Sequence, residues 1–315
     1  MKSLKINFAE DKGHFYGLEI LLGKRCNNNC LHCATISPQN EDFDFDKIQK
    51  RILLGRKYNK NTIAFSGGEP TLYDNLVDLI KFAKSSGYQK IMVVSNGRLF
   101  SYKDFCKKII NAGVDYFLLS IFSTTETIHD YISQTKGSCS QSINGIKNLM
   151  DFKKNVYVNI TITEYNYRYL YETVRDLVKI NLKNINLGLV RPEGKAGRNY
   201  GSCCPRLSKL RPILNKIFTE TKFNKQNFTF FKVPYCLLNK YKETNDIPKM
   251  ILPDLKRWCS FDGRGRFRCI EKKVKKLMFK PKVCSECNFN KKCPGIFEDY
   301  KIFNKDYESE VIPFR

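Results

Sequence analysis

The sequence lacks the apolar segments that membrane insertion and export require. None of its 315 residues lies in an uninterrupted apolar run of roughly 18, the length that a membrane-spanning helix needs. The segment Met1–Cys26 interrupts each apolar stretch with charge, so no signal-peptide core forms. Internal repeats and low-complexity tracts are also missing, and a hydrophobic content of 42% excludes wholesale disorder. We therefore expect a folded cytoplasmic protein with no membrane partner.

Acidic residues are scarce relative to basic ones. The chain has 31 Asp and Glu against 55 Lys and Arg, a formal net charge of +24. Such an excess can mark binding to nucleic acid, a membrane surface or an acidic ligand. The lysines are spread along the chain, however, and the densest runs are only Glu271–Lys276 and Lys280–Lys282. This distribution does not favour nucleic acid as the partner.

Cysteine is abundant in a chain that shows no export signal. The count is 13, an odd number. A cytosolic protein has little use for a disulfide framework, so clustered cysteines in it indicate metal or redox chemistry.

Strand and helix patterns alternate through the first two thirds of the chain. The predicted strands are short, apolar and bounded by turn residues; they cover residues 17–22, 62–65, 90–94, 116–119, 156–162 and 185–190. Helical patterns between and after them cover residues 44–57, 73–85, 103–112, 140–152, 169–180 and 207–222. Six such units predict an α/β fold with a parallel sheet, a partial (β/α)6 barrel like a TIM barrel rather than a flat doubly wound sheet.

The pattern changes after about residue 205. From Phe228 onward the chain consists of short strands, loops and further cysteines. We therefore predict a barrel domain over residues 1–227 and a small cysteine-rich α+β domain over residues 228–315.

The strongest motif follows the first predicted strand directly. Cys26, Cys30 and Cys33 lie on one tight loop with the sequence CNNNCLHC. Three thiolates can hold three irons of a [4Fe–4S] cube, which is usually held by four cysteines, and the remaining iron is then open to a substrate or cofactor. The alternative is zinc with His32 as the fourth ligand, although zinc ligands usually come as two separated pairs.

A glycine-rich turn ends the second predicted strand, with the sequence FSGGEPT over Phe65–Thr71. Glycines permit close backbone approach and unusual dihedral angles. Exposed N–H and C=O groups of such a turn can bind a small zwitterion at the mouth of the barrel. Alone the motif is an ordinary turn, but its place one strand–helix unit after the cysteine loop makes it specific.

Together CNNNCLHC and SGGEPT resemble the radical S-adenosylmethionine (radical SAM) superfamily, over about residues 15–225. The resemblance implies a partial barrel whose three cysteines ligate a [4Fe–4S] cluster, with S-adenosylmethionine chelating the unique iron through its amino and carboxylate groups. It also implies that an electron donor such as flavodoxin or ferredoxin reduces the cluster. Cleavage of the sulfonium then yields a 5′-deoxyadenosyl radical, which abstracts hydrogen from a substrate.

The resemblance also assigns roles to single residues. Cys26, Cys30 and Cys33 match the catalytic cluster ligands, and His32 stands where the family usually has an aromatic residue beside the adenine. The remaining matches to cofactor contacts are Gly67, Gly68, Glu69, Pro70, Ser95, Asn96 and Ser120. The weaker candidates, which follow or lie on later strands, are Asn159, Thr161 and Arg191.

A second cysteine group lies near the end of the sequence. Cys284, Cys287 and Cys293 have the spacing CX2CX5C and resemble Twitch, the truncated relative of the SPASM auxiliary-cluster domain. Phe297 stands where a full SPASM domain continues with a cysteine. The resemblance implies one auxiliary [4Fe–4S] cluster, with structural zinc as the alternative. The candidates for its fourth ligand, in order of preference, are Cys236, Cys269 and Cys259.

Four further cysteines invite simpler interpretations. We expect Cys106 and Cys139 to pack in the core. Cys203 and Cys204 fall near the expected barrel mouth, where either a packing role or hydrogen-atom donation to a substrate radical is open.

The substrate is predicted only by analogy. Many relatives with such a second domain mature ribosomally made peptides, which favours a peptide or protein substrate. A small molecule such as a sugar, nucleotide or cofactor precursor is the close alternative, and RNA, supported only by the charge, is third. A non-catalytic zinc-binding module is the alternative from another class, although it would have no need of the Gly-Gly-Glu-Pro turn.

Overall fold

A nine-stranded sheet, mostly parallel, forms the centre of the molecule. The computed structural model describes residues 17–34, 41–220, 227–238, 259–261, 267–269, 277–291 and 293–314. The strand order is β7-β6-β5-β4-β3-β2-β1-β8-β9, in which only the β8–β9 pair is antiparallel. The strands are β1 (Leu18–Leu21), β2 (Thr62–Ser66), β3 (Lys90–Ser95), β4 (Tyr116–Ser120), β5 (Asn155–Ile162), β6 (Asn184–Leu189), β7 (Asn227–Phe231), β8 (Cys259–Phe261) and β9 (Phe267–Cys269).

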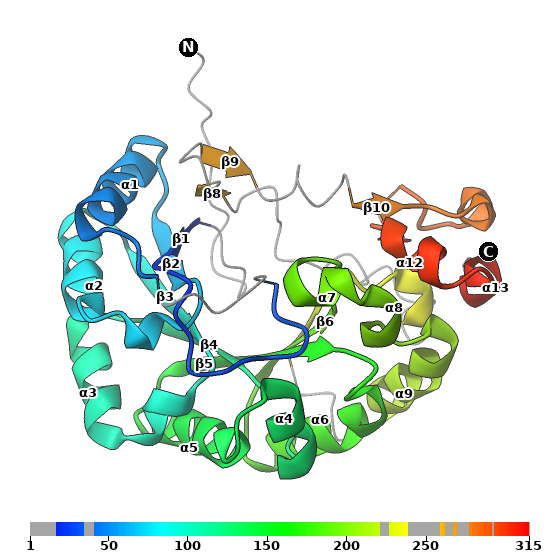
Figure 1. The fold of residues 1–315 in the computed structure, drawn as a ribbon, viewed down its shortest axis with the longest axis horizontal. Coiled ribbons are helices and arrows are strands. Elements are labelled where there is room, and N and C mark those ends of the chain that lie inside the picture. The colour runs from blue at the N-terminus through cyan, green and yellow to red at the C-terminus, as the bar shows by residue number, and fades with distance from the viewer. Residues whose placement is uncertain are drawn as a thin grey trace.

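Helices form an outer ring around the curved sheet (Figure 1). Their apolar faces lie at helical spacing, as in α6, where Leu170, Val174 and Leu177 are buried. Asp44 caps α1 by accepting a hydrogen bond from the backbone N–H of Lys47 at 2.9 Å. The helices around the sheet are α1 (Phe45–Lys57), α2 (Leu76–Ser85), α3 (Lys103–Ala112), α4 (Glu126–Ser133), α5 (Ser138–Asp151), α6 (Leu170–Lys179) and α9 (Leu207–Thr219). Two short helices, α7 (Gly194–Arg198) and α8 (Tyr200–Cys203), lie inward of α9 after β6 (Figure 1).

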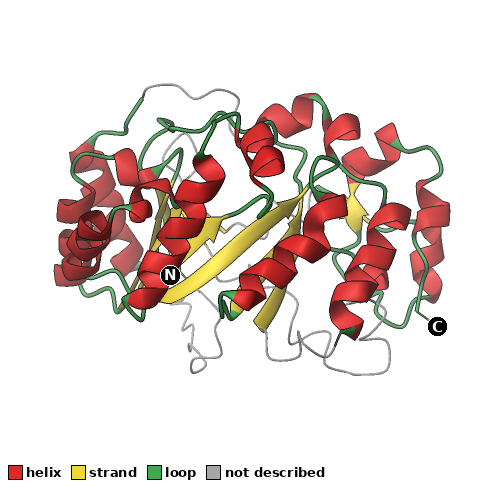
Figure 2. Cartoon of the chain, turned by 90° about the horizontal axis from the view of Figure 1, so that it is seen from below, coloured by secondary structure: helices red, strands yellow, loops and turns green. Residues whose placement is uncertain are grey.

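The two faces of the sheet differ in polarity. On β5, Val156, Val158 and Ile160 are fully or almost fully buried, whereas Tyr157 and Asn159 between them are only partly buried. Side chains alternate between the faces of a strand. One face of the sheet therefore packs against the helices that cover it (Figure 2), and the other lines the inside of the partial barrel.

The expected α/β partial barrel is confirmed. All six predicted strands and the main helices are present, with ends shifted by at most three residues among those described. Two further strands extend the parallel sheet: β7 pairs with β6, and β8 pairs with β1. The strand β7 begins at the predicted domain boundary and pairs with β6 of the main sheet. The division into domains at residue 227 stays a prediction. No described helix is both long and apolar enough to span a bilayer.

The C-terminal segment packs beside α8 and α9 (Figure 1). It contains the antiparallel pair β10 (Met278–Phe279) and β11 (Ile296–Phe297), followed by α12 (Glu298–Phe303) and α13 (Tyr307–Glu310). The carboxylate of Glu310, which is 4% exposed, anchors this segment. It accepts hydrogen bonds from the Tyr300 hydroxyl at 2.5 Å, the Asn304 amide at 3.0 Å and the Ser208 backbone N–H at 3.2 Å.

We predict that Glu310 makes stability depend on acid pH. Burial by itself raises the pKa of Glu310, but its hydrogen bonds and nearby Arg206 outweigh burial and hold the pKa below its usual range. A carboxyl with a lowered folded-state pKa stabilises the protein above its unfolded pKa, about 4.3, and this contribution is lost as the pH falls through the folded pKa. Glu310→Gln should lower the unfolding free energy at pH 7 by about 2 kcal/mol and flatten its decline in acid.

Denaturant unfolding between pH 3 and pH 7 measures this effect. The matched control is Glu308→Gln, the same change at an exposed position of the same helix. Equal pH profiles for wild type and Glu310→Gln would contradict the anchoring role of this carboxylate.

Candidate active site

The cysteine loop after β1 is fixed to two distant helices. The backbone N–H groups of Asn29 and Leu31 donate to the carbonyls of Ser133 and Ile132 at the end of α4, both at 2.9 Å. The carbonyl of Cys33 accepts from the N–H of Lys195 in α7 at 2.8 Å. Because the loop follows β1 directly, it lies at the carboxyl ends of the parallel strands, where barrels of this kind carry their active sites.

The thiols of this loop lie close enough to influence one another electrostatically. Burial, and then the neighbouring cysteines, raise the pKa of Cys30 to about 12. Burial likewise raises the pKa of Cys26 to about 11, with Glu69 and Cys33 contributing. A bound metal reverses this situation, because its positive charge favours the thiolates. Among the described residues no three His, Cys, Asp or Glu side chains form a site for a single metal ion; a cube gives each thiolate its own iron and does not require one.

The glycine turn after β2 lies directly against the backbone that leads into Cys26. The N–H of Gly68 donates to the carbonyl of Gly23 at 2.9 Å. A Cβ atom on Gly68 would lie 2.1 Å from the carbonyl oxygen of Arg25, and Gly67 has a φ of +133°. Only glycine fits this approach.

Glu69 connects this turn to the end of β3. Its side chain, 4% exposed, accepts hydrogen bonds from the Thr71 hydroxyl at 2.6 Å and the Thr71 N–H at 3.1 Å. It also accepts from the Ser95 hydroxyl at 2.8 Å and the Asn96 N–H at 2.7 Å. Burial raises the pKa of Glu69 despite these bonds. Ser95 also accepts from the N–H of Gly97 at 2.9 Å, so its hydroxyl is engaged in holding the turn.

Two residues that the sequence did not indicate, Arg98 and Gln141, brace the cysteine loop together with Asn96. The amide of Asn96 donates to Asn27 at 2.6 Å, and the Arg98 guanidinium donates to Asn28 at 2.9 Å and to the carbonyl of Asn27. Gln141 of α5 accepts from Arg98 at 2.6 Å. The one sequence signal for Arg98 is its position just after Ser95-Asn96-Gly97, at the end of a predicted strand.

His32 faces an aromatic stack beneath the loop. Its ring meets Phe122 edge-on at 4.7 Å, and Phe122 lies 5.0 Å from His129. Burial, and secondarily His129, lower the pKa of His32 to about 4, so the imidazole is neutral near pH 7. Its buried Nδ1 has no hydrogen-bond partner within the described part of the chain. An unpaired buried nitrogen of this kind fits a ligand that carries a complementary group.

The other predicted contacts lie at the same ends of the strands. Pro70 begins a short 3-10 helix, Pro70–Leu72, after Glu69. Ser120 ends β4, and Asn159 is its cross-strand neighbour on β5. Arg191 follows β6 and pairs with Glu193 at 3.2 Å. The strand ends therefore bring the predicted residues to one side of the barrel.

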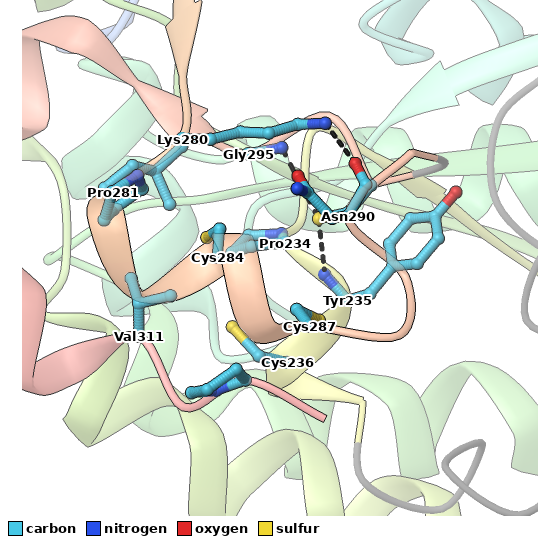
Figure 3. Close-up of a pocket in the computed structure, with 13 residues that line it drawn as sticks. Pro234, Tyr235, Cys236, Lys280, Pro281, Cys284, Cys287, Asn290, Gly295 and Val311 are labelled. Carbon is cyan, nitrogen blue, oxygen red and sulfur yellow. Dashed lines mark hydrogen bonds between the residues drawn. The ribbon is translucent and has the colours of Figure 1, made fainter. Parts of the chain in front are cut away.

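A second group of cysteines lines a pocket beyond β7 (Figure 3). Cys236 comes from the chain just after β7, and its pocket partners from the C-terminal segment are Cys284, Cys287 and Cys293. Burial and neighbouring Cys293 raise the pKa of Cys236 to about 12. The sulfur of Cys293 accepts hydrogen bonds from the N–H groups of Tyr235 at 3.5 Å and Gly295 at 3.4 Å.

The alternative fourth ligands lie elsewhere in the strand order. Cys259 and Cys269 are backbone partners on β8 and β9, at the opposite end of the sheet from β7. Their side chains lie outside the described residues. Cys236 is therefore the candidate that shares a described pocket with the other three. The remaining cysteines are buried, as expected for packing: Cys106, Cys139, Cys203 and Cys204.

The fold and the three-cysteine loop define an enzyme class, and a family match identifies it. A sequence model of the radical SAM superfamily matches residues 20–177, half of the chain. The protein belongs to this superfamily and is a radical SAM enzyme. Membership implies a [4Fe–4S] cluster and S-adenosylmethionine. The residues described above fit these groups, because one loop carries the three cysteines, the glycine turn lies against the backbone leading into them, and His32 presents an unpaired nitrogen.

Individual relatives differ in what they act on. Probable GTP 3′,8-cyclase of Saccharolobus solfataricus is 26% identical over 214 residues, 67% of this chain and 68% of that protein. Streptococcus suis SuiB bound to S-adenosylmethionine has a TM-score of 0.61 at 16% identity, covering 91% of this chain and 74% of SuiB. SuiB bound to its precursor peptide SuiA has a TM-score of 0.60 at 14% identity, covering 79% and 58%. These structural likenesses show the fold.

We predict that Glu69→Gln loosens the cofactor cradle. The substitution places an NH2 group among hydrogen-bond donors, so at least one donor near Ser95 or Asn96 loses its acceptor. The unfolding free energy should fall by about 2 kcal/mol, and equilibrium dialysis should show weaker retention of S-adenosylmethionine. Glu126→Gln, on the exposed first turn of α4, is the control. Unchanged retention by Glu69→Gln would argue against the cradle.

Proposed function

We propose that this enzyme reductively cleaves S-adenosylmethionine and uses the resulting radical to modify a peptide or protein. The observation that carries the proposal is the cysteine loop, held by α4 and α7 and seated against the glycine turn. When bound, the cluster and S-adenosylmethionine supply the electron and the 5′-deoxyadenosyl radical that abstracts hydrogen.

The residues of this chain have separate tasks in the proposal. Cys26, Cys30 and Cys33 would hold a [4Fe–4S] cluster, which would supply the electron for cleavage of S-adenosylmethionine. Gly67 and Gly68 let the turn lie against the backbone that leads into Cys26, and Glu69 holds the turn against β3. Neutral His32 would lie beside the adenine of the cofactor. The barrel wall behind Ser120 excludes water from the reacting bond.

We further propose one auxiliary [4Fe–4S] cluster, ligated by Cys236, Cys284, Cys287 and Cys293. Support comes from their shared pocket and from the two N–H groups aimed at the sulfur of Cys293, since hydrogen bonds to sulfur tune such clusters. Four thiolates leave no iron open. The cluster would therefore join the C-terminal segment to β7 and relay electrons from a flavodoxin or ferredoxin, without anchoring the substrate.

A small-molecule substrate is the second candidate. It is favoured by the likeness to probable GTP 3′,8-cyclase over two thirds of the chain. The peptide substrate is favoured by the precursor peptide bound to SuiB, whose fold this chain shares. The peptide and the small molecule would need different binding groups inside the barrel.

Metal analysis of anaerobically reconstituted protein tests the proposed clusters. We expect about eight irons per chain for the wild type, and about four each for Cys30→Ala and Cys284→Ala. With dithionite and S-adenosylmethionine, 5′-deoxyadenosine should form in the wild type and disappear in Cys30→Ala.

The control is Cys106→Ser, which keeps a donor for the hydrogen bond to the carbonyl of Phe100 and should retain all the iron. Zinc without iron, together with no 5′-deoxyadenosine, would refute the enzyme mechanism. Four irons in the wild type would refute the auxiliary cluster alone.

A further inference from the structure

A row of uncharged polar side chains crosses the inner face of the barrel. Backbone register makes Ser120, Asn159, Asn186 and Thr229 successive neighbours from β4 to β7. All four are partly buried, in contrast to the fully buried apolar residues that alternate with them. The row starts at the carboxyl end of β4, two residues before Phe122 of the His32 stack, and continues to the middle of β7.

The hydrogen bonds within the row orient its central amide. The Thr229 hydroxyl donates to the Oδ1 of Asn186, so the Asn186 NH2 group points away from Thr229 and has no acceptor among the described residues. The Nδ2 of Asn159 donates to the Thr161 hydroxyl at 3.5 Å, which leaves its Oδ1 without a described donor. One donor and one acceptor thus remain available on adjacent strands.

The surrounding wall carries little charge. Within the described residues, the inner face of β4–β7 holds no charged side chain. On β1, Glu19 accepts a hydrogen bond from Ser66 at 2.8 Å. Lys90, at the opposite end of the strands from the cysteine loop, lies over the ring of Tyr116 at 5.9 Å. A buried anion requires cationic partners, whereas a neutral polar group requires only hydrogen bonds.

We propose that Asn159 and Asn186 bind the backbone of one extended residue of the substrate. In an extended chain, the N–H and C=O of a single residue point to the same side, as they do in the hydrogen-bonded pairs of a β-ladder. Adjacent strands are spaced about 4.8 Å apart, which suits two such bonds. The Asn186 NH2 donates to the substrate carbonyl, and the Asn159 Oδ1 accepts from the substrate N–H.

This inference rests on the proposed function and narrows its substrate. The uncharged inner face of β4–β7 favours a peptide segment inserted in extended form over a nucleoside triphosphate, because the described residues of that face offer no cation to its several negative charges. Asn186 and Asn159 would determine specificity through the substrate backbone; for Asn159 this role replaces the cofactor contact for which the sequence made it a weaker candidate.

Affinity selection with two probes tests the inference on the cluster-loaded, unreduced enzyme with S-adenosylmethionine bound. The probes are an equimolar library of acetylated, amidated pentapeptides and GTP, and retained ligand is measured by mass spectrometry. We expect the wild type to retain peptides and not GTP. Asn186→Leu and Asn159→Leu should each reduce retained peptide by about tenfold, as expected for a lost hydrogen bond to a buried partner.

Two further variants complete the design. Asn186→Asp, nearly isosteric, removes both donors and should cause the same loss, so the result does not depend on how well a leucine is tolerated. Asn184→Leu is the matched control: its amide lies on the same face of β6 but already bonds Val156 and Asn227, so peptide retention should stay within about twofold of the wild type.

Retention of GTP instead of peptides, or equal peptide retention by the wild type and the variants at Asn186 and Asn159, would overturn the inference. The same preparations, once reduced, are assayed for 5′-deoxyadenosine. A lack of 5′-deoxyadenosine in the wild type would refute the proposed function, whereas the peptide-retention ratios would still decide the role of the two asparagines.

Discussion

The buried carboxylate of Glu69 is the interaction on which the site depends. It links the turn after β2 to the end of β3 through Ser95 and the backbone of Asn96. The Asn96 amide in turn donates a hydrogen bond to Asn27 in the cysteine loop. The N–H of Gly68 donates to the carbonyl of Gly23, which precedes that loop. A charged group this buried is tolerated only when fully hydrogen-bonded. The same bonds that satisfy Glu69 therefore hold the ends of β2 and β3 together beside the cysteine loop.

The sheet separates stability from chemistry. Its outer face carries residues such as Val158 and Ile160, which pack against the helices and supply the hydrophobic stabilisation. Its inner face carries Asn159 and Asn186, whose polar groups contribute little to the core. Because the two sets alternate along each strand, the residues of the inner face can change without altering the packing of the outer face. The C-terminal segment, anchored by Glu310, packs against the chain that follows β7.

Local sequence predicted most of the fold. The strands at 90–95 and 116–120 are short apolar runs that end in turn residues, so their pattern is visible without any partner. The strands β7 and β8 were missed as members of the sheet, because Asn227–Phe231 and Cys259–Phe261 pair with β6 and β1 only through contacts distant in sequence. The alternation of side chains in such a segment indicates a strand, but it does not indicate which other strand will pair with it.

The sequence by itself determined the class of this protein, because the spacing of Cys26, Cys30 and Cys33 is a local property of one loop and the Gly-Gly-Glu-Pro turn is a local property of another. Only the tertiary structure placed Arg98 against Asn28, Cys236 beside Cys293, and Asn159 beside Asn186. Each of these pairs joins residues that chain folding brings together from different strands or segments. Their proximity depends on strand order and register, which no local pattern specifies.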